Sequence, residues 1–370
     1  ETGGNNMKVL ILTGNFGMGH YSASYSIEEQ LKSTIENSDV TIVDIFDYTL
    51  PHISKLIYRS FSLLINRASI CYNIFYNYTE NGNETSKPIL GDYFYKSLQQ
   101  LLLITKPTVI ISTIPYCSQL VSHYKTKSSC QIPLITCITD ISSHSEWIND
   151  QTDCYLVGSP SLQSELIEKG IPRNKLHVIG IPVKLAFKSH HVLPQLHQEN
   201  KHLLIMGGGL GLLPKSKKFY EELNNLKNIK TTLITGGNKK LFQKLHGKYE
   251  NIDVIGFTNQ VYNYMQQADL IISKPGGITI FEAIHSELPM LIIEPFLQQE
   301  MKNAQFINYH RLGRIISKQQ LINIHYLSQI LNDETNLYEM RQNMKSLKQQ
   351  LNHATLDTII LSYQNCQLGA

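Results

Sequence analysis

The sequence predicts an α/β protein with two Rossmann-like domains, each built on its own parallel sheet, whose sheets face a central cleft. Short apolar runs alternate with helical patterns along the 370-residue chain, which is typical of parallel sheets whose strands are joined by helices. The length suits two domains. Each half also opens with an apolar run and a Gly-rich turn, at 12–20 and 206–211.

The apolar runs predict the strands in order. In the first half they are 8–12, 40–45, 108–113, 133–139, 154–158 and 176–180, and in the second half 202–206, 231–235, 252–256, 270–273 and 290–294. Helices are predicted at 22–36, 160–169, 215–226 and 299–310. Ligands of such sheets bind at the carboxyl ends of the strands, so we look for site residues there.

Domain boundaries follow from this pattern. We expect an N-terminal domain at 7–185, a C-terminal domain at 200–345 and a helical segment at 346–370, with the aperiodic polar stretch 186–200 as linker. The first residues, "ETGGNNMK", lack the apolar core of a signal peptide and are excluded from fold reasoning.

Composition narrows the class of protein. Hydrophobic residues make up 42% and charged residues 17%, ordinary values for a soluble globular protein, and no apolar run is long enough to cross a membrane. A net charge of +3 is too small to indicate nucleic-acid binding. The six cysteines form no CxxC pair, which favours free thiols in a reducing compartment and so a cytoplasmic protein.

The first Gly-rich turn, "LTGNFGMGH", is followed by a predicted helix. Gly14, Gly17 and Gly19 are spaced G-x-x-G-x-G, which is not the dinucleotide spacing, and Asp44 is the one candidate for a ribose-binding acid nearby, so NAD is disfavoured. His20 stands at the helix start, where it could titrate near neutral pH at the ligand edge. A capping or packing histidine is the alternative.

A second polar group follows the strand 133–139 in "TDISSHSEW". Asp140 stands at the strand's carboxyl end, with His144, Glu146 and the only tryptophan, Trp147, close behind. An acid, an imidazole and an indole together suit a polyol, which offers hydroxyls and an apolar face. A polar loop with a helix cap at Asp140 is equally open.

The stretch "KPGGITIFEA" (274–283) predicts a strand, a Gly-Gly turn and a helix. Gly276 and Gly277 permit close approach of another group, and the helix start offers unpaired N–H groups and partial positive charge, which suit phosphate. Glu282, further along the helix, could accept hydrogen bonds from a sugar. Such units also turn corners in α/β folds without binding anything.

Three more turns end strands of the same predicted sheet. They contain Gly208 in "MGGGLG", Gly256 and Phe257 in "IGFTN", and Gln298, Gln299, Glu300 and Asn303 in "EPFLQQEMKNAQF". Each could be a plain connection. Their coincidence along one sheet edge favours a binding site.

These motifs resemble those of the MurG-like GT-B glycosyltransferases, most closely the processive diacylglycerol glucosyltransferases and monogalactosyldiacylglycerol synthases. The resemblance spans nearly the whole chain and rests on "ILTGNFGMGH", "TDISSHSEW", "VIGIPV", "SKPGGITIFEA" and "PFLQQEMKNAQF". In the last motif Phe296-Leu297 replaces the small residues of the family pattern, which leaves the hexose undecided.

The resemblance implies a GT-B architecture and a UDP-sugar in the second domain, with UDP-glucose or UDP-galactose as donor and no metal or other cofactor. It implies contacts to diphosphate from Gly277, Ile278 and Thr279, to ribose from Glu282, to uracil from Phe257, and to the hexose from Gln299 and Glu300 with Asn303 nearby. Gly19, Gly208, Gly256 and Gly276 complete the expected donor site, and His144 and Trp147 the expected acceptor site.

The implied reaction is inverting transfer of a hexose to a lipid acceptor such as diacylglycerol or glycosyl-diacylglycerol. His20 is the first choice for the general base, and Asp140 is the second choice or the partner that orients His20. Transfer to another lipid carrier or to a soluble metabolite, epimerisation of a UDP-sugar, and UDP-sugar sensing without turnover are the alternatives.

An insert precedes the strand 108–113 and predicts one amphipathic helix at 56–78. Its apolar stripe is Ile57, Phe61, Leu64, Ile65, Ala68, Cys71, Tyr72 and Phe75. The stripe could pack on its own domain or enter an anionic membrane surface, which would make the protein peripheral on the inner face of the cell membrane. No nucleic-acid partner is expected.

Overall fold

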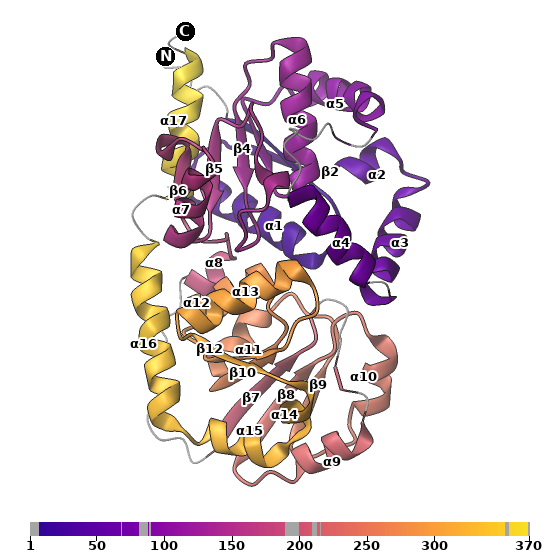
Figure 1. Cartoon of the computed structure of the whole chain (residues 1–370), viewed down its shortest axis with the longest axis vertical. Helices are drawn as coiled ribbons and strands as arrows, with labels where there is room; N and C mark the ends of the chain where they lie inside the picture. The colour runs from indigo at the N-terminus through magenta and orange to yellow at the C-terminus, as the bar shows by residue number, and fades with distance from the viewer. Residues whose placement is uncertain are drawn as a thin grey trace. The chain divides into compact units, whose positions relative to one another are not determined.

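The computed structural model describes residues 7–67, 69–80, 88, 90–188, 200–208, 213–214, 216–351 and 355–368. The described chain forms two compact units, of which the first runs to Leu185 and resumes at Leu351, and the second is Ala186–Gln350. Each unit contains a six-stranded parallel sheet covered by helices (Figure 1). The predicted α/β class with two parallel sheets is therefore confirmed.

The first unit has the sheet order β2-β1-β3-β4-β5-β6. Its elements are β1 (Lys8–Thr13), α1 (Met18–Thr34), β2 (Asp39–Asp44), α2 (Ile45–Thr49), α3 (Ser54–Arg67), α4 (Ser69–Glu80), α5 (Gly91–Thr105), β3 (Val109–Ser112), α6 (Pro115–Ser128), β4 (Leu134–Cys137), the 3-10 helix η1 (Ser145–Trp147), β5 (Cys154–Val157), α7 (Pro160–Glu168), η2 (Arg173–Lys175), β6 (Leu176–Val178) and α17 (Leu356–Leu368). Strand order reverses between β1 and β3, so ligands are expected at the carboxyl ends of those two strands.

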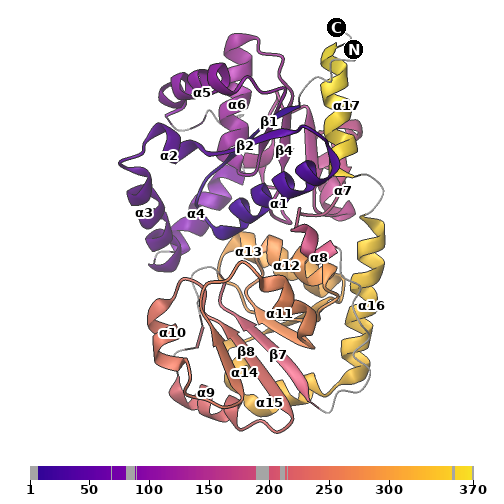
Figure 2. The ribbon, with the colours of Figure 1, turned by 180° about the vertical axis from the view of Figure 1, so that it is seen from behind.

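The two faces of this sheet follow from strand alternation in β1. Val9 and Ile11 join the core that includes residues of α1 and α17, whereas Leu10 and Leu12 join the core that includes residues of α2, α5 and α6. The chain's last helix thus packs with its first unit, as Figure 2 shows. Both faces of the sheet are covered, which is why its strands are almost continuously apolar.

The second unit has the sheet order β12-β11-β10-β7-β8-β9. Its elements are α8 (Leu185–Lys188, which begins one residue before the unit), β7 (Lys201–Met206), α9 (Lys217–Asn224), β8 (Ile229–Ile234), α10 (Lys239–Leu245), β9 (Ile252–Ile255), α11 (Val261–Gln267), β10 (Leu270–Ser273), α12 (Gly277–His285), β11 (Met290–Ile293), α13 (Gln298–Tyr309), β12 (Gly313–Ile316), α14 (Lys318–Ile322), α15 (Ile324–Leu331) and α16 (Glu334–Gln350). The order reverses between β7 and β10, which places the Gly208 and Gly276 turns side by side at the switch point.

Every strand predicted from the apolar runs is present, and one strand was missed. β12 is a short edge strand that begins with glycine, and two of its four residues are exposed, so it lacks the apolar signal of the others. Of the predicted linker, residues 189–199 lie outside the described residues. The predicted C-terminal segment contains the end of α16 in the second unit and α17 in the first.

The insert differs from its prediction, because it forms two helices, α3 and α4, instead of one. Phe61, from the predicted stripe, packs inward on Phe16 of the first Gly-rich turn, with ring centroids 4.9 Å apart, and also contacts Tyr72 of α4. Leu64 of the same stripe is 39% exposed, and a further apolar set, described below, is exposed as well. The inward part of the stripe therefore serves the insert's packing on its own unit.

Candidate active site

The first candidate site, in the first unit, lies at the carboxyl ends of β1, β3 and β4. Gly14 follows β1 in a tightly packed position, where a Cβ would lie 3.0 Å from Ile114 Cδ1. A Cβ at Gly17 or Gly19 would meet no atom within 4 Å. Those two glycines therefore leave the backbone at the start of α1 open to approach from outside.

His20 lies in the first turn of α1 and is partly buried. Its Nδ1 lies 3.1 Å from the carbonyl oxygen of Thr113, just after β3, and 2.8 Å from Oγ1 of Thr139, two residues after β4. A carbonyl oxygen can only accept, so Nδ1 carries the proton and the lone pair of the neutral ring lies on Nε2. This is the tautomer that a general base acting through Nε2 requires.

The protonation state of His20 follows from its surroundings. Burial lowers its pKa from the ordinary value of 6.5, while the negative charge of Asp140 and the hydrogen bond to the Thr113 carbonyl act in the opposite direction. The balance keeps the imidazole neutral at pH 7. Asp140 is itself mostly buried and lies near enough for its charge to act on His20, while its role as base or orienting partner stays a prediction.

Asp44, the acid weighed for a dinucleotide, is committed to a structural role. Its carboxylate caps α2 by accepting from the N–H groups of Phe46 and Asp47. It also accepts hydrogen bonds from the hydroxyls of Tyr21, at 2.9 Å, and Tyr58, at 2.6 Å. These contacts account for an acidic residue at the end of β2, so no ribose contact is needed to explain it.

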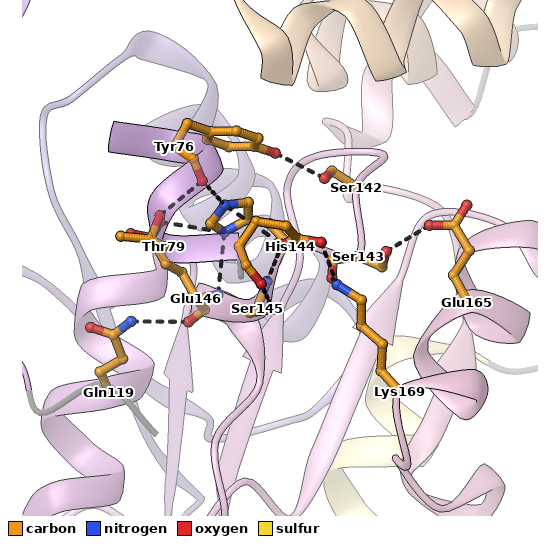
Figure 3. Close-up of polar contacts among 11 residues, drawn as sticks. Tyr76, Thr79, Gln119, Ser142, Ser143, His144, Ser145, Glu146, Glu165 and Lys169 are labelled. Atoms are coloured by element: carbon orange, nitrogen blue, oxygen red, sulfur yellow. Dashed lines mark hydrogen bonds and ion pairs between the residues drawn. The ribbon is translucent and has the colours of Figure 1, made fainter. Parts of the chain in front are cut away.

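His144 and Trp147, predicted to contact the acceptor, are both 2% exposed. His144 Nε2 donates to the Tyr76 carbonyl oxygen at 2.9 Å, its Nδ1 accepts from the Glu146 N–H, and its ring lies against that of Tyr76. Figure 3 shows these contacts. They show that His144 anchors α4. The acceptor contacts of His144 and Trp147 stay predictions, and because both side chains are buried, such contacts would require local rearrangement.

More contacts strengthen this anchor of α4. Glu80, at the end of the helix, accepts from the Ser145 N–H at 2.8 Å and from Lys169 Nζ at 2.6 Å. Lys169 also donates to the Ser143 carbonyl oxygen at 2.6 Å (Figure 3). The loop that begins with Asp140 therefore holds the insert in place.

A separate candidate site, in the second unit, lies at the carboxyl ends of the second sheet. Gly276 is the N-cap residue of α12, and within the described residues no side chain caps that helix. The N–H groups of Gly277, Ile278 and Thr279 are therefore available to an anion. Asn303 is buried and donates to the Pro275 carbonyl oxygen at 2.9 Å, which fixes the turn.

Lys274 is a site residue that sequence reasoning missed. Its Nζ lies 2.7 Å from Oε1 of Glu300 in the first turn of α13. Its aliphatic stem lies over Gly208, where φ is +68° and a Cβ would be 3.3 Å from Lys274 Cε. The Lys274 ammonium thus lies beside the Gly-Gly turn that is expected to bind phosphate. It is held by Glu300, which is predicted to contact the hexose. In the sequence, the position of Lys274 directly before Pro-Gly-Gly could have indicated that it lies at this turn.

The remaining predicted donor residues lie on the same edge of the sheet. Glu282, on α12, is 9% exposed, and Gln299 is half-buried in the first turn of α13. Gly256 and the exposed Phe257 follow β9, three strands from β10 and so about 14 Å away. A ligand touching both Gly277 and Phe257 must therefore extend across the sheet edge. Their ligand contacts stay predictions.

The described residues contain neither a metal-site cluster nor a membrane-spanning helix. Among the described residues, no three His, Cys, Asp or Glu side chains are grouped as a metal site would need. The helices that the structure describes include none with the length and apolarity to span a bilayer. Metal independence stays a prediction.

Comparisons with known proteins match both halves of the chain. Residues 20–183 match the family model "Monogalactosyldiacylglycerol (MGDG) synthase", and residues 202–356 match "Glycosyltransferase family 28 C-terminal domain". Among similar curated proteins is the processive diacylglycerol beta-glucosyltransferase of Bacillus licheniformis, 27% identical over 92% of this chain and 91% of the relative. The protein of that name from Staphylococcus saprophyticus is 29% identical over 92% and 88%.

Solved structures show the same fold. MurG of Acinetobacter baumannii superposes with a TM-score of 0.58 at 14% identity, covering 97% of this chain and 99% of MurG. The glycosyltransferase of kitacinnamycin gives a TM-score of 0.63 at 12% identity, covering 98% and 100%. With two family models in tandem and relatives along nearly its full length, the chain is similar to the processive diacylglycerol beta-glucosyltransferases and monogalactosyldiacylglycerol synthases, and it has the GT-B fold that MurG also has.

Proposed function

We propose that the chain transfers a hexose from UDP-glucose or UDP-galactose, with inversion, to a hydroxyl of diacylglycerol or glycosyl-diacylglycerol. The observation that carries this proposal is the tandem match: an MGDG-synthase half is followed by a glycosyltransferase half, in a chain that aligns along nearly its full length with diacylglycerol glucosyltransferases. The geometry of each half supplies a matching chemical role.

The first unit supplies the base. The acceptor oxygen attacks C1 of the hexose, the bond from C1 to the diphosphate oxygen breaks, and the hydroxyl proton passes to His20 Nε2. The Nδ1 contacts leave the lone pair on that nitrogen. Attack opposite the leaving group inverts the configuration at C1.

The second unit holds the donor and stabilises the leaving UDP. The uncapped N–H groups at the start of α12 and the nearby cation of Lys274 would stabilise the negative charge that develops on the diphosphate. Glu282 would hold the ribose, and Gln299 and Glu300 the hexose. On this proposal the protein needs no metal ion.

The insert would contact the membrane that contains the acceptor. Ile70, Ile74 and Tyr78 are 74%, 65% and 78% exposed and are spaced four residues apart, so they form one apolar face of α4. On α3, Leu56 and Leu63 are exposed, as are Lys55 and Arg59. Apolar side chains beside cations suit an anionic interface, and we place the enzyme on the inner face of the cell membrane.

A donor-by-acceptor screen tests the proposal. UDP-glucose, UDP-galactose and UDP-N-acetylglucosamine are each incubated with diacylglycerol vesicles, glucosyl-diacylglycerol vesicles, a soluble polyol or no acceptor, and products are read by mass spectrometry. We expect hexosyl lipid from a UDP-hexose with diacylglycerol. Product only with the polyol, or conversion of the donor without any acceptor, would contradict the proposal.

A further inference from the structure

Two residues that the sequence did not mark as functional hold the ring of His20. Thr113 and Thr139 follow the adjacent strands β3 and β4, and they are 93 and 119 residues away from His20 in the chain. Both threonines are buried, and both contact the same nitrogen, Nδ1. Two buried acceptors on one ring nitrogen fix both the rotation of the ring and the location of its proton.

Thr139 can satisfy the geometry in only one direction. Its Oγ1 lies 3.3 Å from the Thr113 carbonyl oxygen, to which it donates, so the same oxygen accepts from His20 Nδ1 at 2.8 Å. The proton on Nδ1 is therefore shared between a hydroxyl and a carbonyl. A ring with its proton on Nε2 would point a nitrogen lone pair at the Thr113 carbonyl, which is repulsive.

The backbone of His20 is anchored to the same place. Ser24 Oγ donates to the His20 carbonyl oxygen at 2.9 Å and lies 3.0 Å from Thr113 Oγ1. Thr113 Oγ1 in turn donates to Thr13 Oγ1 at 2.9 Å. These buried hydroxyls tie the first turn of α1 to the ends of β1 and β3, so the ring and its helix are held by one network.

We infer that Thr139, acting with the Thr113 carbonyl, is the positioning residue that holds His20 with its basic nitrogen, Nε2, toward the acceptor. Its neutral hydroxyl orients the imidazole through Nδ1, as the carboxylate does in an Asp–His pair. Asp140 then acts on His20 by its charge from nearby. The inference rests on the proposed role of His20 as the general base.

The test compares three substitutions. Thr139→Val keeps the shape but removes the hydroxyl, Thr139→Ser keeps the hydroxyl, and Thr136→Val is the matched control. Thr136 is a buried threonine of β4 whose Oγ1 lies 3.1 Å from Ser118 Oγ and from Thr152 Oγ1, and none of its hydrogen bonds reaches His20. Turnover of a UDP-hexose with diacylglycerol vesicles is measured across pH, beside a melting curve for each variant.

We expect Thr139→Val to lower kcat roughly three- to tenfold, the size of one hydrogen bond's net contribution. The pH at which its kcat/KM falls on the acid side should also move down, because the imidazolium loses an acceptor for its Nδ1 proton. Thr139→Ser should restore both values. Thr136→Val should lower the melting temperature while kcat and the acid limb stay as in the parent.

Other outcomes separate this inference from the proposed function. If Thr139→Val turns over within twofold of the parent with the same acid limb while His20→Asn is inactive, the base stands and the positioning role is wrong. If His20→Asn itself retains turnover, the base proposal is wrong, and the role of Thr139 falls with it. Should Thr139→Val not fold, Thr139→Ala is measured in its place against the same criteria.

Discussion

His20 combines a fixed tautomer with a lowered pKa, and both bear on turnover. Burial lowers its pKa below 6.5, so the ring is neutral and able to accept a proton at pH 7. Because only the neutral ring accepts the acceptor's proton, activity should fall on the acid side of the profile, with its midpoint below pH 6.5.

His20→Asn should lower turnover by roughly 10²–10⁴-fold, the usual contribution of a general base. UDP binding should be unchanged, because the N–H groups of α12, Lys274 and Glu282, which are proposed to hold UDP, belong to the second unit, and of the expected donor-site residues only Gly19 belongs to the first. Steady-state kinetics and calorimetry with UDP give the two values. Turnover near that of the parent would transfer the base role to Asp140 or to another group.

Glu282→Gln should weaken UDP binding by about 1–3 kcal/mol, because an amide replaces the carboxylate that would accept from ribose hydroxyls. The similar size of glutamine preserves the packing of α12, in which Glu282 is largely buried. Calorimetry measures the affinity, and a melting curve checks the fold. An unchanged dissociation constant would remove Glu282 from the donor site.

Residue types at strand ends could be recognised from the sequence, but their partners could not. His20 and the two glycines of "KPGG" stood out because these residues lie in segments that follow predicted strands, where ligands bind. Thr113 and Thr139 are ordinary residues whose role depends on contacts across about a hundred positions. The Lys274–Glu300 pair likewise exists only because β10 and β11 are neighbours in the sheet.

At the scale of elements, the insert is the feature with the least predictable packing. Its periodicity predicted one helix, whereas α3 and α4 are separate helices. The inward packing of Phe61 is decided by Phe16, a residue of a distant loop. β12 was missed for a similar reason, because the role of its first residue, Gly313, depends on a neighbouring strand. A Cβ at Gly313 would lie 2.1 Å from the Met290 carbonyl oxygen, so glycine is what permits the close pairing of β12 with β11.

The exposed face of α4 leads to a prediction about membranes. Ile70→Ser with Ile74→Ser should reduce binding to anionic vesicles, because burial of each fully inserted isoleucine contributes about 1.5–3 kcal/mol to the binding free energy. Leu103→Ser with Ile104→Ser is the control, since these two residues of α5 are 69% and 74% exposed in the same unit. Vesicle sedimentation at low salt measures the binding.

Equal loss of sedimentation in the α4 and α5 variants would mean that α4 has no special part. No sedimentation of the parent protein would contradict membrane contact altogether. Melting curves should be similar for all variants, because the substituted side chains of both pairs are exposed.

For the whole molecule, a buried histidine predicts how stability depends on pH. His285, at the end of α12, has its pKa lowered to about 3 by burial, with the charges of Lys188 and Lys348 acting in the same direction. The unfolded chain binds this proton near pH 6.5, so unfolding is favoured as the pH falls from 6.5 toward 3. Between pH 6.5 and pH 5 this one group should reduce the free energy of unfolding by about 2 kcal/mol.

Denaturant unfolding of the parent and of His285→Gln at these two pH values measures the effect. The variant should lose about 2 kcal/mol less than the parent between pH 6.5 and pH 5. His325→Gln, at an exposed histidine of the same unit, is the control and should behave as the parent does. Equal pH dependence in the parent and His285→Gln would show that His285 is not held neutral.

The architecture was predictable at this scale because alternating strands and helices leave few topologies, and the two sheet orders place both Gly-rich turns at switch points. The proposed mechanism, with the base in one unit and the donor in the other, requires direct displacement at C1. Direct displacement inverts C1, so the anomeric configuration of the product decides whether it occurs. Enzyme, diacylglycerol vesicles and the UDP-α-hexose that is turned over are incubated, and the purified glycolipid is read by proton NMR. A β-linked hexosyl-diacylglycerol, absent from the His20→Asn reaction, is the predicted result. An α-linked product, or no glycolipid from either UDP-hexose, would contradict the account.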